Sequence, residues 1–217
     1  MALAEKITKL QNNLTYPNHG WIYRQLAHPL VLYFVKKTYN VLYLGKFLVT
    51  LLKQLGLISR AVSLAERQGA KPVFIVRKMS NALAVLALHQ LKKIARFNEH
   101  RQKIAALYNR ELTDLPGVRL PQLRPDNIYL RYTICTDKAK FLIKQAKKQG
   151  IELGCWYDCP VAPKDTNLDK VFYTLGSCPK AEKLAKQSVN LPTNIQTSEK
   201  DALRVIKVVK DIFSVGV

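Results

Sequence analysis

The feature that most constrains the fold of this sequence is a long stretch whose apolar side chains recur at helical spacing. Ser80 is a candidate N-cap at its start, and Leu112 is its last regularly spaced apolar residue. Such a helix spans roughly 45 Å, and Pro116-Gly117 ends it. A helix of this length usually joins two bodies, so we expect a linker helix. Its apolar positions are Leu83, Leu86, Leu91, Ile94, Phe97, Ile104 and Leu107.

Strand and helix patterns alternate after this helix. The expected elements are a strand over 129–136, a helix over 138–149, a strand over 151–157, a helix over 179–187, a strand over 188–191 and a helix that starts at a capping box in 198–201. This β-α-β-α-β-α order predicts an α/β (α+β) fold, a small three-stranded sandwich with helices on one face. We assign the linker helix and this sandwich to one domain, residues 77–217.

Residues 1–76 differ in character and form the second expected domain, a helical, aromatic-rich N-terminal segment. Only one acidic residue, Glu5, occurs before position 66. No stretch here approaches the roughly 20 apolar residues that a spanning helix needs. The first residues lack the apolar core of a secretory signal, so we expect a cytoplasmic protein.

The charge balance points to anionic partners. The 217 residues include 35 Lys and Arg against 15 Asp and Glu, a net charge of +20, which favours nucleic acid, anionic membrane or phosphorylated substrates. The lysines are spread over several amphipathic helices without a nucleic-acid-binding motif, which argues against nucleic acid. Lys36, Lys37, Lys46 and Lys53 are candidates for contact with an anionic membrane surface. The alternative is that their segment packs on another protein domain.

Catalytic motifs are sparse in this sequence. It has no glycine-rich phosphate loop, no HExxH and no GxSxG. The four cysteines form no CxxC pair and have no histidine at finger spacing, so we expect free thiols and no metal site. Trp156 and Tyr157 follow an expected strand, a common place for ligand contact. The alternative is that these two rings only pack at the rim of the domain.

A series of short motifs follows a familiar order between residues 77 and 213. Met79 to Leu91 is a small-residue helix ending in Gln-Leu, and Arg96 to Arg101 continues it with arginines. The later motifs are Leu115-Pro-Gly117, Gly150 to Gly154, Trp156-Tyr157, Ala181 to Ala185, Asn190-Leu-Pro192 and Ser198 to Asp201. In this order the motifs resemble the C-terminal part of the DegT/DnrJ/StrS family of sugar aminotransferases.

The resemblance implies a pyridoxal-phosphate-dependent enzyme of fold type I. It would move an amino group, usually from glutamate, to a keto group of a nucleotide-linked sugar, and the complete enzyme would be a homodimer. A lipid-linked sugar is the substrate that the expected membrane contact of the N-terminal segment would suit. The family's Schiff-base lysine and the acidic partner of its pyridinium nitrogen lie in a large domain, upstream of the linker helix. Residues 1–76 contain no segment resembling the serine-x-x-lysine loop. We therefore expect a chain that is inactive and binds no pyridoxal phosphate without its missing half or an aminotransferase subunit.

The resemblance assigns few site residues. Arg77 or Lys78 stands where the family has its linker arginine, although the expected glycine–tyrosine–asparagine before it is replaced by Phe74 to Val76. Trp156 and Tyr157 stand where many members have histidine–tyrosine near the substrate sugar. As the alternative, Arg77 and Lys78 are solvated charges before a helix. A second hypothesis for the whole chain, a basic membrane-surface or polyanion-binding module without catalysis, stays open.

Overall fold

The computed structural model of this chain describes residues 3–38, 47, 50–52, 62–71 and 77–214. Its contacts divide the chain into two compact units. The N-terminal unit holds residues 1–66 and 70–92, and the C-terminal unit holds residues 67–69 and 93–217. The expected division at residue 76 lies within the N-terminal unit of this grouping, and a division of the chain into two domains at that residue stays a prediction.

Most of the described part of the N-terminal segment is helical. Asn18 accepts a hydrogen bond at 2.8 Å from the backbone N–H of Trp21, which helps α2 to begin, and α2 contacts α5. The backbone N–H of Lys78 donates to the carbonyl of Thr15 at 2.9 Å. No helix among the described residues is both long and apolar enough to span a bilayer. The helices whose bounds are described in this part of the chain include α1 (Leu3–Asn12), α2 (His19–Thr38), α4 (Leu64–Arg67) and α5 (Asn81–Leu91).

The predicted single linker helix is two helices. Ser80 caps α5 by accepting from the backbone N–H of Leu83, as its sequence position predicts. The helix ends at Leu91, and α6 (Ile94–Leu112) begins after a turn at Lys92 and Lys93. The expectation of one continuous helix was wrong because Leu91 and Ile94 keep a helical spacing of three residues across the turn. Apolar periodicity alone cannot reveal such a break.

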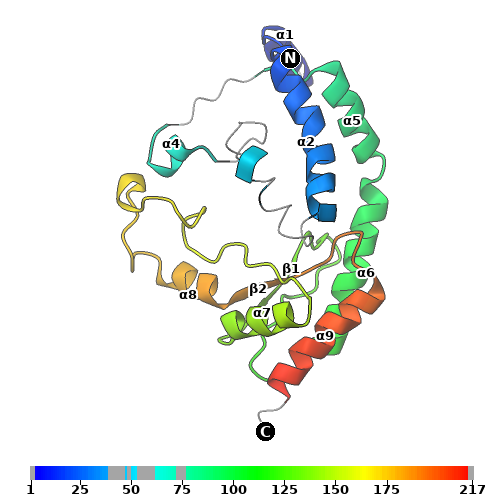
Figure 1. The fold of residues 1–217 in the computed structure, drawn as a ribbon, viewed down its shortest axis with the longest axis vertical. Coiled ribbons are helices and arrows are strands. Elements are labelled where there is room, and N and C mark those ends of the chain that lie inside the picture. Colours follow the sequence, from blue (N-terminus) through cyan, green and yellow to red (C-terminus); the bar gives the residue numbers. More distant parts are fainter. Residues whose placement is uncertain (1–2, 39–46, 48–49, 53–61, 72–76, 215–217) are drawn as a thin grey trace. The chain divides into compact units, whose positions relative to one another are not determined.

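The C-terminal unit is built around a two-stranded antiparallel sheet. Strand β1 (Tyr132–Cys135) pairs with β2 (Ser188–Leu191), with Tyr132 opposite Leu191. The two strands lie side by side near the middle of this unit (Figure 1). The predicted bounds of β2 are confirmed, whereas β1 is shorter than predicted. Tyr129 has φ +46°, so the regular alternation starts only after it, and Leu130 is 61% exposed. The remaining elements are α7 (Ala139–Lys148), the 3-10 helix η1 (Asp169–Val171), α8 (Pro179–Gln187) and α9 (Glu199–Phe213).

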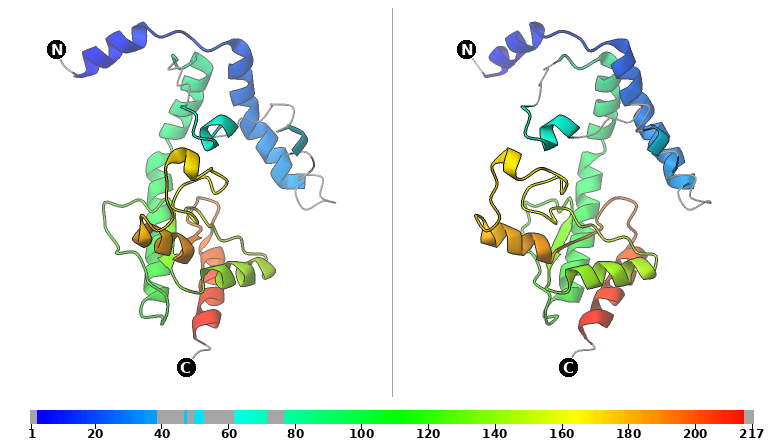
Figure 2. Two further views of the ribbon diagram at one scale, coloured as in Figure 1. Left: turned by 90° about the vertical axis from the view of Figure 1, so that its left-hand side faces the viewer. Right: turned by 60° about the vertical axis from the view of Figure 1, so that its left-hand side comes forward.

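Helices and sheet enclose one apolar core. Helix α9 contacts both α6 and α7, and it runs along α6 in the turned views (Figure 2). Alternation along β1 directs Tyr132 and Ile134 into this core. Helix α9 carries the predicted capping box, in which Ser198 accepts from the backbone N–H of Asp201 and the Asp201 carboxylate accepts from that of Ser198. The helical contributions to the core include Ile104, Tyr108, Leu112, Leu142, Ala146, Val205, Val209 and Phe213.

The third predicted strand, over 151–157, is wrong. Among the described residues this segment pairs only at Gly154, whose N–H and C=O each bond to Asn190 at 2.9 Å. The chain then turns, and Tyr157 takes a left-handed conformation with φ +64°. A strand needs extended backbone at successive residues, so this turn ends the pairing. The predicted three-stranded sandwich is therefore a two-stranded sheet with one bridged segment beside β2.

Candidate functional site

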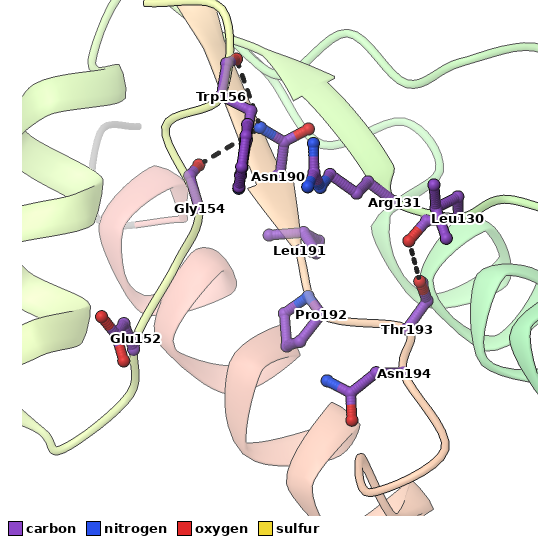
Figure 3. Close-up of a pocket in the computed structure, with 10 residues that line it drawn as sticks. All are labelled: Leu130, Arg131, Glu152, Gly154, Trp156, Asn190, Leu191, Pro192, Thr193 and Asn194. Carbon is purple, nitrogen blue, oxygen red and sulfur yellow. Dashed lines mark hydrogen bonds between the residues drawn. The ribbon is translucent and has the colours of Figure 1, made fainter. Parts of the chain in front are cut away.

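The candidate site is a cavity of about 320 Å³ beside β2 in the C-terminal unit. Such a volume is at the lower end of the range for ligand pockets. Its walls come from the residues just before β1, the bridged segment around Gly154 and the residues at and after the end of β2 (Figure 3). The lining residues are Leu130, Arg131, Glu152, Gly154, Trp156, Asn190, Leu191, Pro192, Thr193 and Asn194.

One wall of the cavity is a stacked pair of side chains. The guanidinium carbon of Arg131 lies 3.8 Å from the centroid of the Trp156 ring. Arg131 directly precedes β1, and Trp156 follows the bridge at Gly154, so two separate backbone pairings with β2 bring them together. A guanidinium over an indole face gains about 0.5–2 kcal/mol, more where water is excluded. The pair presents an aromatic surface next to a positive charge.

Asn190 organises this wall from β2. Its side chain is 5% exposed, and its carbonyl oxygen accepts from the Thr133 hydroxyl at 2.7 Å. Its amide nitrogen lies 3.5 Å from the carbonyl oxygens of Gly154 and Trp156 (Figure 3). A buried amide is costly unless it is bonded, so these contacts give Asn190 a defined orientation. Asn190 thereby fixes the segment that carries Trp156.

Buried hydroxyl groups hold the other end of the cavity. Thr193, 2% exposed, donates to the carbonyl of Tyr129 at 2.8 Å. The Tyr108 hydroxyl donates to the carbonyl of Pro192 at 2.9 Å from α6. Burial, with a smaller contribution from Asp201, raises the pKa of Tyr108 above its ordinary value. The phenol therefore stays neutral at physiological pH and acts here as a structural hydrogen-bond donor.

The electrostatics near the cavity favour an anion over nucleophilic catalysis. Among the residues that the structure describes, Arg131 and Glu152 are the only ionisable ones that line it, and Glu152 points away from Arg131 (Figure 3). Desolvation, followed by the charge of Asp158, raises the pKa of the Cys159 thiol, so Cys159 is protonated at neutral pH. Within the described ranges, no three His, Cys, Asp or Glu side chains gather as a metal site would require.

The structure places the four sequence-predicted substrate residues in two units. Trp156, 57% exposed, lines the cavity, whereas Tyr157, 69% exposed, is not among its lining residues. Arg77 is exposed and Lys78 is half-buried in the N-terminal unit, where the Lys78 ammonium lies 5.3 Å from the centroid of the Tyr16 ring. Arg77 and Lys78 thus belong to the N-terminal unit, and Trp156 and Tyr157 belong to the C-terminal unit. A substrate role for all four residues stays a prediction.

The four lysines predicted to face a membrane are only partly described. The ammonium of Lys37 lies 5.1 Å from the centroid of the Tyr33 ring. The Lys36 side chain, Lys46 and Lys53 lie outside the described residues. Contact of these lysines with a membrane stays a prediction.

Sequence reasoning missed Arg131, Asn190 and Thr193 as site residues. Asn190 belonged to a recognised motif, but its side chain was given no role. The available signal was a polar residue in the middle of a short strand, because a buried amide there needs specific partners. Arg131 carried no signal of its own, since strand alternation also suits an arginine facing solvent.

The described residues do not form a site for a covalently bound aldehyde cofactor. Such a site needs a lysine sheltered enough to react as the neutral amine. Every lysine whose side chain the structure describes is exposed or half-buried. The described part of the chain therefore does not provide the lysine that would bind pyridoxal phosphate, and we assign no step of the reaction to these lysines.

Comparison with known proteins identifies relatives for most of the chain. A sequence profile of the DegT/DnrJ/EryC1/StrS aminotransferase family matches residues 52–210. A dTDP-3-amino-3,4,6-trideoxy-alpha-D-glucose transaminase from Streptomyces venezuelae is 31% identical over 130 residues, which cover 59% of this chain and 34% of the relative. A dTDP-4-dehydro-2,3,6-trideoxy-D-glucose 4-aminotransferase from Saccharopolyspora spinosa is 32% identical over 112 residues, 50% of this chain and 28% of the relative.

Solved structures agree with this assignment of the fold. The crystal structure of DesV from S. venezuelae matches with a TM-score of 0.56 and 28% identity, covering 62% of this chain and 37% of DesV. An aminotransferase from Brucella abortus matches with a TM-score of 0.54 at 24% identity, covering 67% of this chain and 40% of that chain. The chain thus spans well under half the length of these relatives.

Proposed function

The chain belongs to the DegT/DnrJ/EryC1/StrS aminotransferase family, and from this premise we propose that it is the C-terminal portion of a pyridoxal-phosphate-dependent sugar aminotransferase. The observation that carries the proposal is the match of the family profile to residues 52–210, together with a cavity built by that same region. The two curated relatives are named for amino transfer on dTDP-linked sugars. A keto sugar carried on a nucleotide is therefore the substrate class that we favour.

In this proposal the cofactor supplies the electron sink, and this chain supplies part of the substrate wall. The indole of Trp156 is an exposed flat surface at the cavity, suited to packing against a sugar ring or a base. We expect Tyr157 and the linker residues Arg77 or Lys78 to complete the substrate side in the full enzyme. The lysine that binds the cofactor would come from outside these 217 residues.

The proposed partner is the remaining part of the family fold, in the same polypeptide or a separate subunit. Helix α5 supports this, because it is apolar on every side and yet none of its residues is buried. Val85 is 69% exposed, Leu88 53% and Leu91 61%. A helix that is apolar all round is normally covered in the working protein. We expect the complete enzyme to be a homodimer.

Reconstitution tests the proposed function. The chain is combined with the polypeptide that supplies the rest of the family sequence, and amino transfer from glutamate to a dTDP-linked keto sugar is measured. We expect turnover only when both parts are present. Trp156→Ala should lower kcat/KM for the sugar while the glutamate-dependent absorbance change of the cofactor is retained. Phe172→Ala, which removes a 95% exposed ring away from the cavity, is the matched control. Full turnover without this chain would overturn the proposal.

A further inference from the structure

Arg131 has an unusual position for an arginine beside a strand. It precedes β1, and its guanidinium is held over the Trp156 ring at 3.8 Å, next to the Asn190 side chain (Figure 3). Because Tyr132 faces the core, alternation places Arg131 on the opposite face of the strand, with Thr133. The side chain is half-buried and lines the cavity rather than extending into solvent.

The indole of Trp156 contacts the face of the Arg131 guanidinium, a contact that leaves the N–H groups of the guanidinium unbonded. A guanidinium has five N–H donors in a fixed fork, and stacking on an indole face uses none of them. Within the described part of the chain, no carboxylate lies within 4.0 Å of its nitrogen atoms and no acceptor takes a hydrogen bond from its side chain. The fork is therefore oriented and open toward the cavity.

The surroundings of the fork favour an anionic oxygen ligand. Apart from Arg131, the lining residues that the structure describes are neutral except for Glu152, which is exposed and directed away from Arg131. The Asn190 side chain already contacts Thr133 and two backbone carbonyls, so it supports the cavity wall. Arg131 is therefore the side chain that remains to bind a ligand. Phosphate oxygens match the arginine fork in a bidentate manner.

We propose that Arg131 is a recognition residue for the diphosphate group of the sugar substrate, with Trp156 as the platform that orients it. This inference rests on the proposed function and adds a residue and a ligand group to it. A cavity of about 320 Å³ suits a diphosphate and its immediate neighbours rather than a whole nucleotide sugar. The same diphosphate chemistry occurs in nucleotide-linked and in lipid-linked sugars.

The test measures ligand binding to the 217-residue chain by NMR, with the tryptophan indole N–H signals as the readout. The chain has two tryptophans, so Trp156→Phe assigns the signals. The probes are dTDP, geranyl diphosphate and thymidine, which carries no phosphate. We expect the Trp156 signal to shift with a diphosphate and not with thymidine. Arg131→Gln should weaken diphosphate binding about tenfold or more, and Arg131→Lys should weaken it less, because the charge remains while the fork is lost.

The chain carries a net charge of +20, so nonspecific electrostatic attraction of a diphosphate has to be distinguished from binding at the cavity. Arg119→Gln is the matched control for this. Arg119 is exposed in the same unit and lines a different cavity. Equal weakening by the Arg119 and Arg131 variants, equal binding of thymidine, or no shift with either diphosphate would overturn the inference. A response to dTDP alone supports a nucleotide-linked substrate, and a response to both diphosphates supports the shared group.

The assay of the reconstituted enzyme separates this inference from the proposed function. If Arg131→Gln weakens diphosphate binding but the reconstituted enzyme never transfers an amino group, only the proposed function fails. If the enzyme is active and Arg131→Gln leaves KM for the sugar unchanged, only the role of Arg131 fails.

Discussion

At the residue scale, Tyr108 connects α6 to the segment after β2 that lines the cavity, and Tyr132 connects β1 to α6. Tyr108 and Tyr132 are both fully buried, and the Tyr132 hydroxyl donates to the Asn109 side chain at 2.9 Å. Burial raises the pKa of both phenols above the ordinary value of about 10. Each phenol is therefore neutral in the folded chain at pH values where it ionises in the unfolded chain.

This difference predicts a loss of stability in alkali. The contribution of the neutral phenols is complete below pH ~10 and decreases as the pH rises, because only the unfolded chain then releases the protons. We expect the free energy of unfolding, measured with denaturant at pH 8, 10 and 11, to fall more steeply in the wild type than in Tyr108→Phe/Tyr132→Phe. Equal slopes in the two proteins would contradict this explanation.

Asn190 gives a second prediction at this scale. Asn190→Ala removes the acceptor of the Thr133 hydroxyl and the donor to Gly154 and Trp156, so it should destabilise the chain by about 1–3 kcal/mol. Thr133→Val removes the hydroxyl alone. In a double-mutant cycle the two changes should be coupled by at least ~0.5 kcal/mol, because they share one hydrogen bond. Strictly additive losses would show that the bond contributes nothing.

At the scale of elements, α9 begins at a complete capping box formed by Ser198 and Asp201. Hydrogen bonds from the Ser198 side chain and backbone lower the pKa of Asp201. Ser198→Ala should cost about 1 kcal/mol of unfolding free energy. The carboxylate stabilises the helix above its unfolded pKa of about 3.9, and this effect is lost as the pH falls. Asp201→Asn should therefore destabilise at pH 7 and have little effect at pH 2, as measured by denaturant unfolding. An unchanged difference at the two values would contradict the capping explanation.

Local signals explain which elements were predictable. The α8 and β2 bounds and the cap of α9 follow from residues adjacent in sequence, such as Pro179 and Ser198, and these predictions are confirmed. The turn at Lys92–Lys93 and the failure of the third strand depend on backbone angles that apolar spacing does not encode. The Arg131–Trp156 pair depends on strand pairing between distant segments, so no local pattern could reveal it.

At the scale of the whole molecule, the exposed apolar surface of α5 predicts dependence on a partner. Leu88→Glu places a charge on this helix, and we expect it to weaken association with the rest of the enzyme at least tenfold in sedimentation or titration experiments. Leu203→Glu, at a 50% exposed position on α9, is the control and should not change association. Unaltered association of the Leu88 variant would show that α5 is not the contact surface.

The most direct test of the central claim is to locate the lysine that binds the cofactor covalently. The reconstituted enzyme is loaded with pyridoxal phosphate, reduced with borohydride and digested, and the labelled peptide is identified by mass spectrometry. We predict a single labelled lysine in the polypeptide that supplies the rest of the family fold, and no specific label on this chain with or without that partner. Specific labelling of one lysine within these 217 residues would contradict the claim.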